Sequence, residues 1–166
     1  MRSKCIWALL VGVLGSAVYA GDVLATAPTT PPAPTTTILG QSRFDSFRVD
    51  ARQFLPDWRA RLETRGLSDV YTVDNKFEPG ASTGWHSHPG PSLILVIAGT
   101  VTNYSSDVPN CSGQSYTAGT GFIDPGGRDV HMLQNNGTIP AETIAVQILP
   151  ADAPRKTPAP QPANCQ

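Results

Sequence analysis

The chain is poor in charge and has no excess of basic residues. Only 15% of its 166 residues are charged, with 12 Lys and Arg against 13 Asp and Glu, which gives a formal net charge of −1. Proteins that bind nucleic acid through its phosphates present clustered Lys and Arg. The composition therefore argues against a nucleic-acid partner.

The chain also lacks long apolar segments. Beyond residue 20, none approaches the roughly 20 residues needed to cross a bilayer. The first twenty residues place Arg2 and Lys4 before an apolar run of about 15 residues and end at Ala20. This layout predicts a signal peptide over 1–20, with an uncleaved anchor as the alternative. We expect a secreted protein, extracellular or in the cell envelope, without membrane contact after cleavage.

Cysteine is equally scarce. Cys5 lies in the predicted signal peptide, which leaves Cys111 and Cys165 in the mature chain. Outside the cytosol an even pair favours a disulfide, and a loop of about 55 residues closed in this way would add about 4 kcal/mol of stability. Two unpaired thiols remain the alternative, because the sequence does not place the two residues together.

The regions before residue 70 are not strand-like in pattern. Residues 21–42 contain the Pro/Thr tract TAPTTPPAPTTT and are expected to form an extended linker. Residues 43–69 are expected to form a helical extension, because Pro56 suits a first helical turn, Trp58 and Leu62 are four apart, and Gly66 is a stop signal. The arginines of this segment, Arg59, Arg61 and Arg65, are interpreted as a solvated face.

Residues 70–152 have a different pattern. Short segments rich in Val, Ile, Tyr, Phe and Thr alternate with Gly, Pro, Asn and Asp. At least six such segments without a helical interval predict an all-β sandwich or barrel. The tail over 153–166 is irregular, and we expect one domain of ordinary size.

The chain has only three histidines, and two of them are His86 and His88. On an extended strand their side chains point to the same side, with Cα atoms roughly 6.5–7 Å apart, so that both can bind one ion. The remaining histidine, His131, lies in another strand-like segment. Together the three residues are candidate metal ligands.

Two motifs around these histidines resemble those of the cupin superfamily. The first family motif is Gly, five residues, His-x-His, three or four residues, Glu, six residues, Gly. The second is Gly, five residues, Pro-x-Gly, two residues, His, three residues, Asn. The corresponding residues of this chain are Gly80, His86, His88, Ser92 and Gly99, then Gly119, Pro125, Gly127, His131 and Asn135.

The resemblance covers roughly residues 70–150 and implies a small cupin jelly-roll barrel that holds one divalent metal ion through His86, His88 and His131. Ser92 occupies the position of the family's carboxylate ligand, and one extra residue precedes His131. Zn, Cu, Fe, Mn and Ni all accept imidazole, and the sequence does not choose among them. Glu142 and Gln147 have opposite parity in the last strand, so only one of them can face the barrel.

Three further residues lie close to the motifs. Trp85 is expected to face away from His86 and to pack against the protein rather than a substrate. Asp124 and Asp129 flank the turn DPGGRD, where Asp commonly caps the turn, with a contact to His131 as the alternative.

Two classes of function remain open. The first is a metal-dependent enzyme of oxygenase, isomerase or decarboxylase type that acts on a small oxygenated molecule. The second is a binding module for a small molecule or for the metal, or a degenerate cupin with a structural role at the cell envelope. No residue is assigned as catalytic, because the sequence offers no histidine beyond the three candidate ligands. A homodimer also stays open.

Overall fold

The structure is a computed structural model and describes residues 30–52 and 57–165. The predicted signal peptide over 1–20 and the beginning of the predicted linker lie outside these residues. Within the described part of the chain, no helix is long and apolar enough to cross a membrane.

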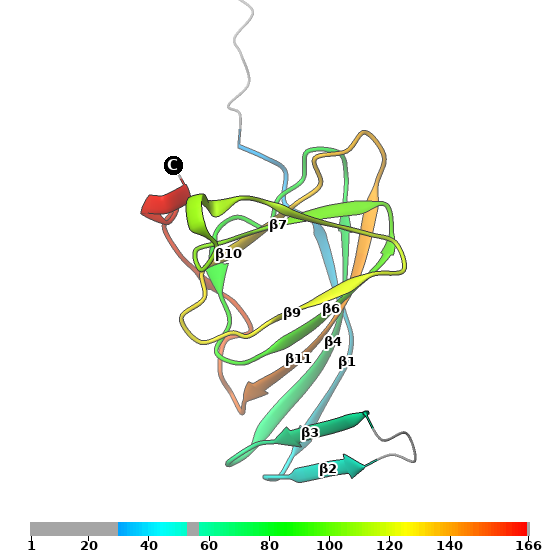
Figure 1. Cartoon of the computed structure of the whole chain (residues 1–166), viewed down its shortest axis with the longest axis vertical. Helices are drawn as coiled ribbons and strands as arrows, with labels where there is room; N and C mark the ends of the chain where they lie inside the picture. The colour runs from blue at the N-terminus through cyan, green and yellow to red at the C-terminus, as the bar shows by residue number, and fades with distance from the viewer. Residues whose placement is uncertain (1–29, 53–56, 166) are drawn as a thin grey trace, which may run out of the picture.

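Two antiparallel five-stranded sheets face each other and enclose the interior of the domain (Figure 1). The long sheet has the order β1 (Thr35–Phe44), β4 (Ser68–Phe77), β11 (Ala141–Pro150), β6 (Ser92–Ala98) and β9 (Gly121–Asp124). The short sheet has the order β12 (Thr157–Pro158), β5 (His86–Ser87), β10 (His131–Gln134), β7 (Thr100–Ser105) and β8 (Gln114–Thr117). The predicted all-β jelly-roll barrel is therefore confirmed.

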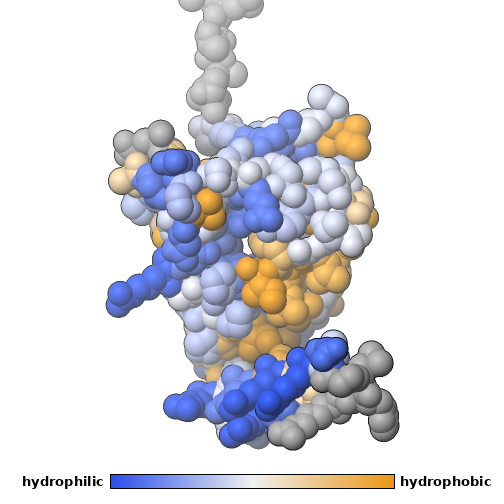
Figure 2. Space-filling model, viewed as in Figure 1, coloured by the Kyte–Doolittle hydropathy of each residue, from blue (hydrophilic) through white to orange (hydrophobic). Residues whose placement is uncertain are grey.

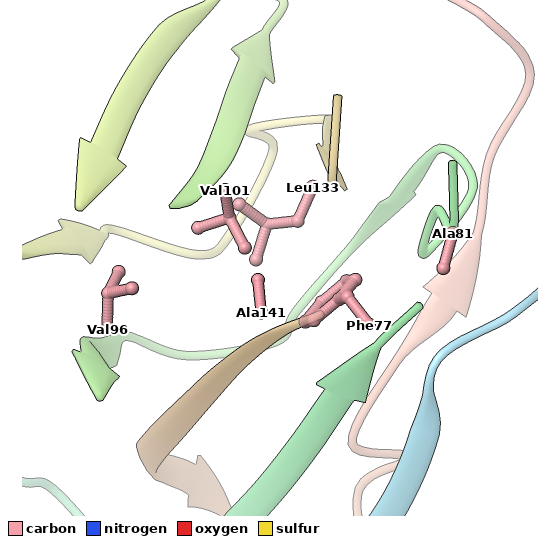
Figure 3. Close-up of a cluster of buried hydrophobic side chains, with 6 residues drawn as sticks. All are labelled: Phe77, Ala81, Val96, Val101, Leu133 and Ala141. Carbon is pink, nitrogen blue, oxygen red and sulfur yellow. The ribbon is translucent and has the colours of Figure 1, made fainter. Parts of the chain in front are cut away.

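Alternation along the strands decides which side chains enter the interior. In β11, every second residue from Ala141 to Leu149 is buried. One buried cluster joins the two sheets (Figure 3); it consists of Phe77, Ala81, Val96, Val101, Leu133 and Ala141. A second cluster belongs to the long sheet and consists of Tyr71, Val73, Ile94, Ala145 and Leu149. These clusters hold the sheets together and leave room for polar side chains elsewhere in the interior.

The prediction of a helix within 43–69 is wrong for the residues of this range that the structure describes. Residues Arg48–Arg52 (β2) and Arg59–Glu63 (β3) form an antiparallel hairpin instead. An isolated helix of this length is marginal in water, so tertiary pairing readily overrides it. An ion pair between Arg59 Nη2 and Asp50 Oδ2 at 2.5 Å joins the two strands. The predicted solvated face of Arg59, Arg61 and Arg65 is confirmed, because all three side chains are exposed.

The predicted linker over 21–42 also extends too far. From Thr35 onward it is strand β1, which pairs with β4 along its length. Thr and Ile are β-branched and suit an edge strand. The prolines that precede them in the sequence made this segment look like a linker. At the other end, Thr157 and Pro158 add a short strand to β5. The barrel thus runs beyond the expected bounds of 70–152 on both sides and takes in part of the tail over 153–166.

Large apolar side chains remain on the outward side of β6 and β9. Leu93, Leu95, Ile97 and Ile123 are each at least 41% exposed. Figure 2 shows hydrophobic surface next to the hydrophilic β2–β3 hairpin at the bottom of the view. The outer surface of the long sheet is therefore apolar where it approaches a charged hairpin.

Candidate metal centre

The three histidines lie on two neighbouring strands. His86 begins β5, His88 follows that strand, and His131 begins β10, where it is the direct cross-strand partner of His86. All three side chains are buried. The short sheet therefore places the His-x-His pair beside a histidine that is 45 residues away in the sequence.

The Nε2 atoms of the three rings converge. His86 Nε2 is 3.1 Å from His88 Nε2 and 3.1 Å from His131 Nε2. Two nitrogens bound about 2.0–2.1 Å from one ion at angles of roughly 90–110° would be about 2.8–3.4 Å apart. The arrangement therefore fits a single divalent cation, and the three residues form a group that could hold one.

Backbone carbonyl groups fix the tautomers of two rings. His86 Nδ1 donates to the carbonyl oxygen of Gly84 at 2.8 Å, and His88 Nδ1 donates to that of Arg155 at 2.5 Å. A carbonyl oxygen only accepts, so each Nδ1 carries the proton and each neutral ring leaves Nε2 unprotonated. When both rings are neutral, two Nε2 lone pairs therefore face each other.

Two carboxylates approach the third ring. His131 Nδ1 is 3.6 Å from Asp124 Oδ1 and 3.8 Å from Asp129 Oδ2, and it has no hydrogen-bond partner. Asp124 Oδ1 accepts from the backbone N–H of Gly126 at 2.8 Å, whereas Asp129 Oδ1 accepts from Ser105 Oγ at 2.8 Å. Asp124 thus caps its turn as expected, and both carboxylates also lie beside His131.

Burial keeps two of the rings neutral. It lowers the pKa of His86 to about 3, with a further contribution from the nearby His131. Burial likewise lowers the pKa of His131 to about 4, although Asp124 opposes the shift. At neutral pH both imidazoles are therefore unprotonated, which is the form that binds metal.

Burial shows which of the two β11 residues, Glu142 or Gln147, faces the interior of the barrel. Gln147 is buried and lines the cavity at the histidines, whereas Glu142 is partly exposed and lies 3.8 Å from Lys76. Ser92 also lines the cavity and accepts a hydrogen bond from Gln147 Nε2 at 3.4 Å. Glu142 therefore does not replace the carboxylate that position 92 lacks.

The histidines face a cavity of about 190 Å³ between the sheets. Its apolar wall includes Val73, Ile94 and Leu133, and its polar wall includes Thr143 and Gln147. A small interior of mixed polarity of this kind suits a small molecule that has both apolar and oxygen-bearing parts.

Sequence reasoning did not find the two cations of this cavity, Arg155 and Lys156. Arg155 Nη1 donates to Gln147 Oε1 at 3.1 Å, and Lys156 Nζ donates to the carbonyl oxygen of Thr83 at 2.6 Å. Burial, and to a smaller extent Arg155, lowers the pKa of Lys156. Both residues belong to the Pro-rich tail, where no local pattern indicates that the chain returns to the barrel.

The tail is held by Cys111 and Cys165, which form a disulfide with Cα atoms 4.8 Å apart. They lie in two short 3₁₀ turns, Pro109–Cys111 and Ala163–Cys165. A disulfide is typical of proteins outside the reducing cytosol. Trp85 lies near this bond in an outer groove and not in the histidine cavity, as the sequence predicted.

The chain is similar to several solved structures. A cupin domain from Bordetella pertussis Tohama I has 18% identity and a TM-score of 0.46, and the match covers 73% of this chain and 98% of that one. A double-stranded β-helix protein from Klebsiella pneumoniae has 22% identity and a TM-score of 0.47, with 70% and 86% covered. A recombinant oxalate oxidase in complex with glycolate has 20% identity and a TM-score of 0.46, with 54% and 45% covered.

No protein-family model matches the chain, and no curated protein sequence matches it. The fold is therefore identified from this chain's own topology, in which two antiparallel sheets form a barrel and bring the histidines of both motifs together. The chain has the cupin fold.

Proposed function

We propose that this protein binds one divalent metal ion through His86, His88 and His131 and uses the ion to bind a small oxygenated molecule inside the barrel. The observation that carries the proposal is the convergence of three Nε2 atoms, in which those of His88 and His131 each lie 3.1 Å from that of His86. Two lone pairs at this distance repel each other, and a cation between them turns the repulsion into ligation.

The small molecule is expected to be compact and to bear oxygen atoms, preferably with negative charge. A volume of about 190 Å³ is below the roughly 300–1,000 Å³ of sites for drug-sized ligands. Arg155 and Lys156 add positive charge to the cavity, and a bound ion adds more. Both features favour a small anion over a neutral or cationic ligand.

Secretion is part of the same proposal. The layout of residues 1–20 and the disulfide both support an extracellular or cell-envelope location. An oxidising environment disfavours sustained ferrous iron, which leaves Zn²⁺, Cu²⁺, Mn²⁺ and Ni²⁺ as the leading ions.

The proposal is tested on the purified mature protein by elemental analysis and by thermal melts with and without a chelator. We expect about one equivalent of metal per chain and a lower melting temperature after chelation. His131→Ala should lose the metal as fully as His86→Ala. The control Trp85→Phe should keep it, because Trp85 lies outside the cavity. A wild-type protein that takes up no metal near neutral pH would contradict the proposal and favour a degenerate cupin.

A metal-dependent enzyme is the second candidate, and Lys156 is the observation that favours it. When bound, the metal would supply a Lewis acid that polarises an oxygen of the substrate. Lys156 lies in the cavity with a lowered pKa, so its ammonium group is a more ready proton donor than a solvated lysine. Turnover of a small hydroxy or keto acid by the metal-loaded protein, lost in both His131→Ala and Lys156→Gln, would support the enzyme. Binding without turnover would support the binding module.

A further inference from the structure

The site lacks the carboxylate of the family motif at position 92, yet the structure brings one to the neighbouring strand. Ser92 on β6 and Asp124 on β9 are direct cross-strand partners. Partners of this kind point to the same face of the sheet, with Cβ atoms about 4.5–5.5 Å apart. Both side chains are buried in the interior.

The Asp124 carboxylate lies beside the histidines with one oxygen unused. Its Oδ1 accepts from Gly126 N–H, whereas its Oδ2 is buried, has no hydrogen-bond partner and lies 3.7 Å from His88 Nε2. His88 Nε2 is one of the atoms that converge on the proposed ion. The free oxygen is therefore next to the ligating end of that ring.

No lysine or arginine in the described part of the chain lies within ion-pair distance of this carboxylate. Its close contacts are with the imidazoles of His88 and His131 instead. A buried carboxylate without a cation is unfavourable, because it loses its hydration and gains little in return. A divalent ion at the histidines would supply the compensating charge.

We propose that Asp124 is the fourth protein ligand of the metal and contributes Oδ2 in place of the family's carboxylate at position 92. This inference rests on the proposed metal-binding function. In the structure, the carboxylate of Asp124 lies close to His131 but is not in the cluster of ligand atoms that contains His86. Ligation therefore requires this carboxylate to turn toward the ion when the ion binds. Ser92 itself lines the cavity, and its hydroxyl is engaged with Gln147.

The proposal changes the expected chemistry of the site. Three neutral imidazoles leave the full +2 charge of the ion, whereas an added carboxylate reduces the charge of the complex to +1. A carboxylate oxygen also favours a harder cation such as Mn²⁺ over Cu²⁺, relative to an all-imidazole site.

The test compares variants of the mature protein by calorimetric titration with Zn²⁺ and by the visible absorption of bound Co²⁺, which depends on coordination number and ligand type. Asp124→Asn keeps an acceptor for Gly126 N–H and removes the charge. It should weaken Zn²⁺ binding by at least about tenfold and change the Co²⁺ spectrum. The matched control Asp129→Asn removes the same charge beside His131 and should leave the spectrum as in wild type.

Restoring a carboxylate at position 92 gives a second, independent variant. The double variant Ser92→Glu/Asp124→Asn should recover most of the Zn²⁺ affinity that Asp124→Asn loses. If Asp124→Asn binds Zn²⁺ as tightly as wild type, with the same Co²⁺ spectrum, the proposal is overturned while the histidine site stands. If wild type binds no metal, the proposed function fails as well.

A crystal structure of the wild-type protein with Zn²⁺ needs no variant to fold. We expect an Asp124 oxygen about 2.0–2.2 Å from the ion. An ion held by the three histidines, with Asp124 still directed at His131 Nδ1, would overturn the proposal.

Discussion

His131 lies directly opposite His86 across the β5–β10 pair, with their Nε2 atoms 3.1 Å apart. This single relationship joins the two sequence motifs into one site. It also means that two buried imidazoles share a small volume, which has consequences for the stability of the protein.

The first prediction concerns acid stability without metal. Burial lowers the pKa values of His86 and His131 to about 3 and 4. Below about pH 6.5 the unfolded chain therefore binds protons that the folded chain does not, and stability falls as the pH drops from about 6.5 toward 4. Each histidine should contribute on the order of 1 kcal/mol per pH unit in this window. Urea unfolding of the chelated protein at several pH values measures the slope, and His131→Asn should make it shallower.

The carboxyl group of Asp69 affects the stability of the fold in a separate, more acidic pH range. Hydrogen bonding to Arg43 lowers the pKa of Asp69 to about 2. The stability from Asp69 is therefore complete above about pH 4 and is lost only as the pH falls toward 2. A slope between pH 4 and 6.5 that persists in His131→Asn without change would contradict the assignment to the histidines.

The second prediction uses position 92 alone. Ser92→Glu places a carboxylate in the cavity, lowers the charge of the site by one and should strengthen Mn²⁺ binding relative to Cu²⁺. Ser87→Glu is a matched control, because Ser87 alternates with the two histidines and points to the other side of β5. Competition titrations with the two ions measure the preference. If the ratio of Mn²⁺ affinity to Cu²⁺ affinity is the same in Ser92→Glu and in wild type, residue 92 does not reach the ion.

The third prediction concerns the tail. Reduction of the Cys111–Cys165 bond, or replacement of both residues by Ser, should lower the free energy of unfolding by about 4 kcal/mol in the chain-entropy model. It should also weaken metal binding, because the tail brings the Arg155 carbonyl oxygen that orients His88. Denaturant unfolding and Zn²⁺ titration measure the two effects. Unchanged metal affinity after reduction would mean that contacts with β5 hold the tail without the disulfide.

The fourth prediction concerns the turn that carries Asp124. A Cβ at Gly126 would clash with the carbonyl oxygen of Gly90, and the φ angle of Gly126 is +70°. Gly127 has a similar φ of +73° but open space around it. Gly127→Ala should therefore cost only about 1–2 kcal/mol of backbone strain, and Gly126→Ala clearly more. Thermal melts compare the two variants, and equal losses would contradict the close approach to Gly90.

The fifth prediction concerns export. The chain should be cleaved after Ala20 and should leave the cell with its disulfide formed. Intact mass under non-reducing conditions, before and after reduction and alkylation, measures both. A native product with two alkylatable thiols would contradict the disulfide, and a retained N-terminus would contradict cleavage.

The amino-acid sequence by itself determined the class of fold and three side chains of the site. Period-two patterns in short segments specify β-strands, because alternation is a local property of an extended chain. The motif around His86 and His88 places two imidazoles on one side of a strand for the same reason. The second motif indicates that His131 joins them, although one extra residue precedes it.

Only the tertiary structure decided the contacts between segments. Residues 59–63 have a helical pattern but pair with β2, because hydrogen bonds and ion pairs across a hairpin outweigh a weak local preference. The return of Arg155 to His88 and the register of Ser92 with Asp124 depend on how distant strands align. Register is a property of two segments together, so the sequence could offer a contact of Asp124 or Asp129 with His131 only as an alternative.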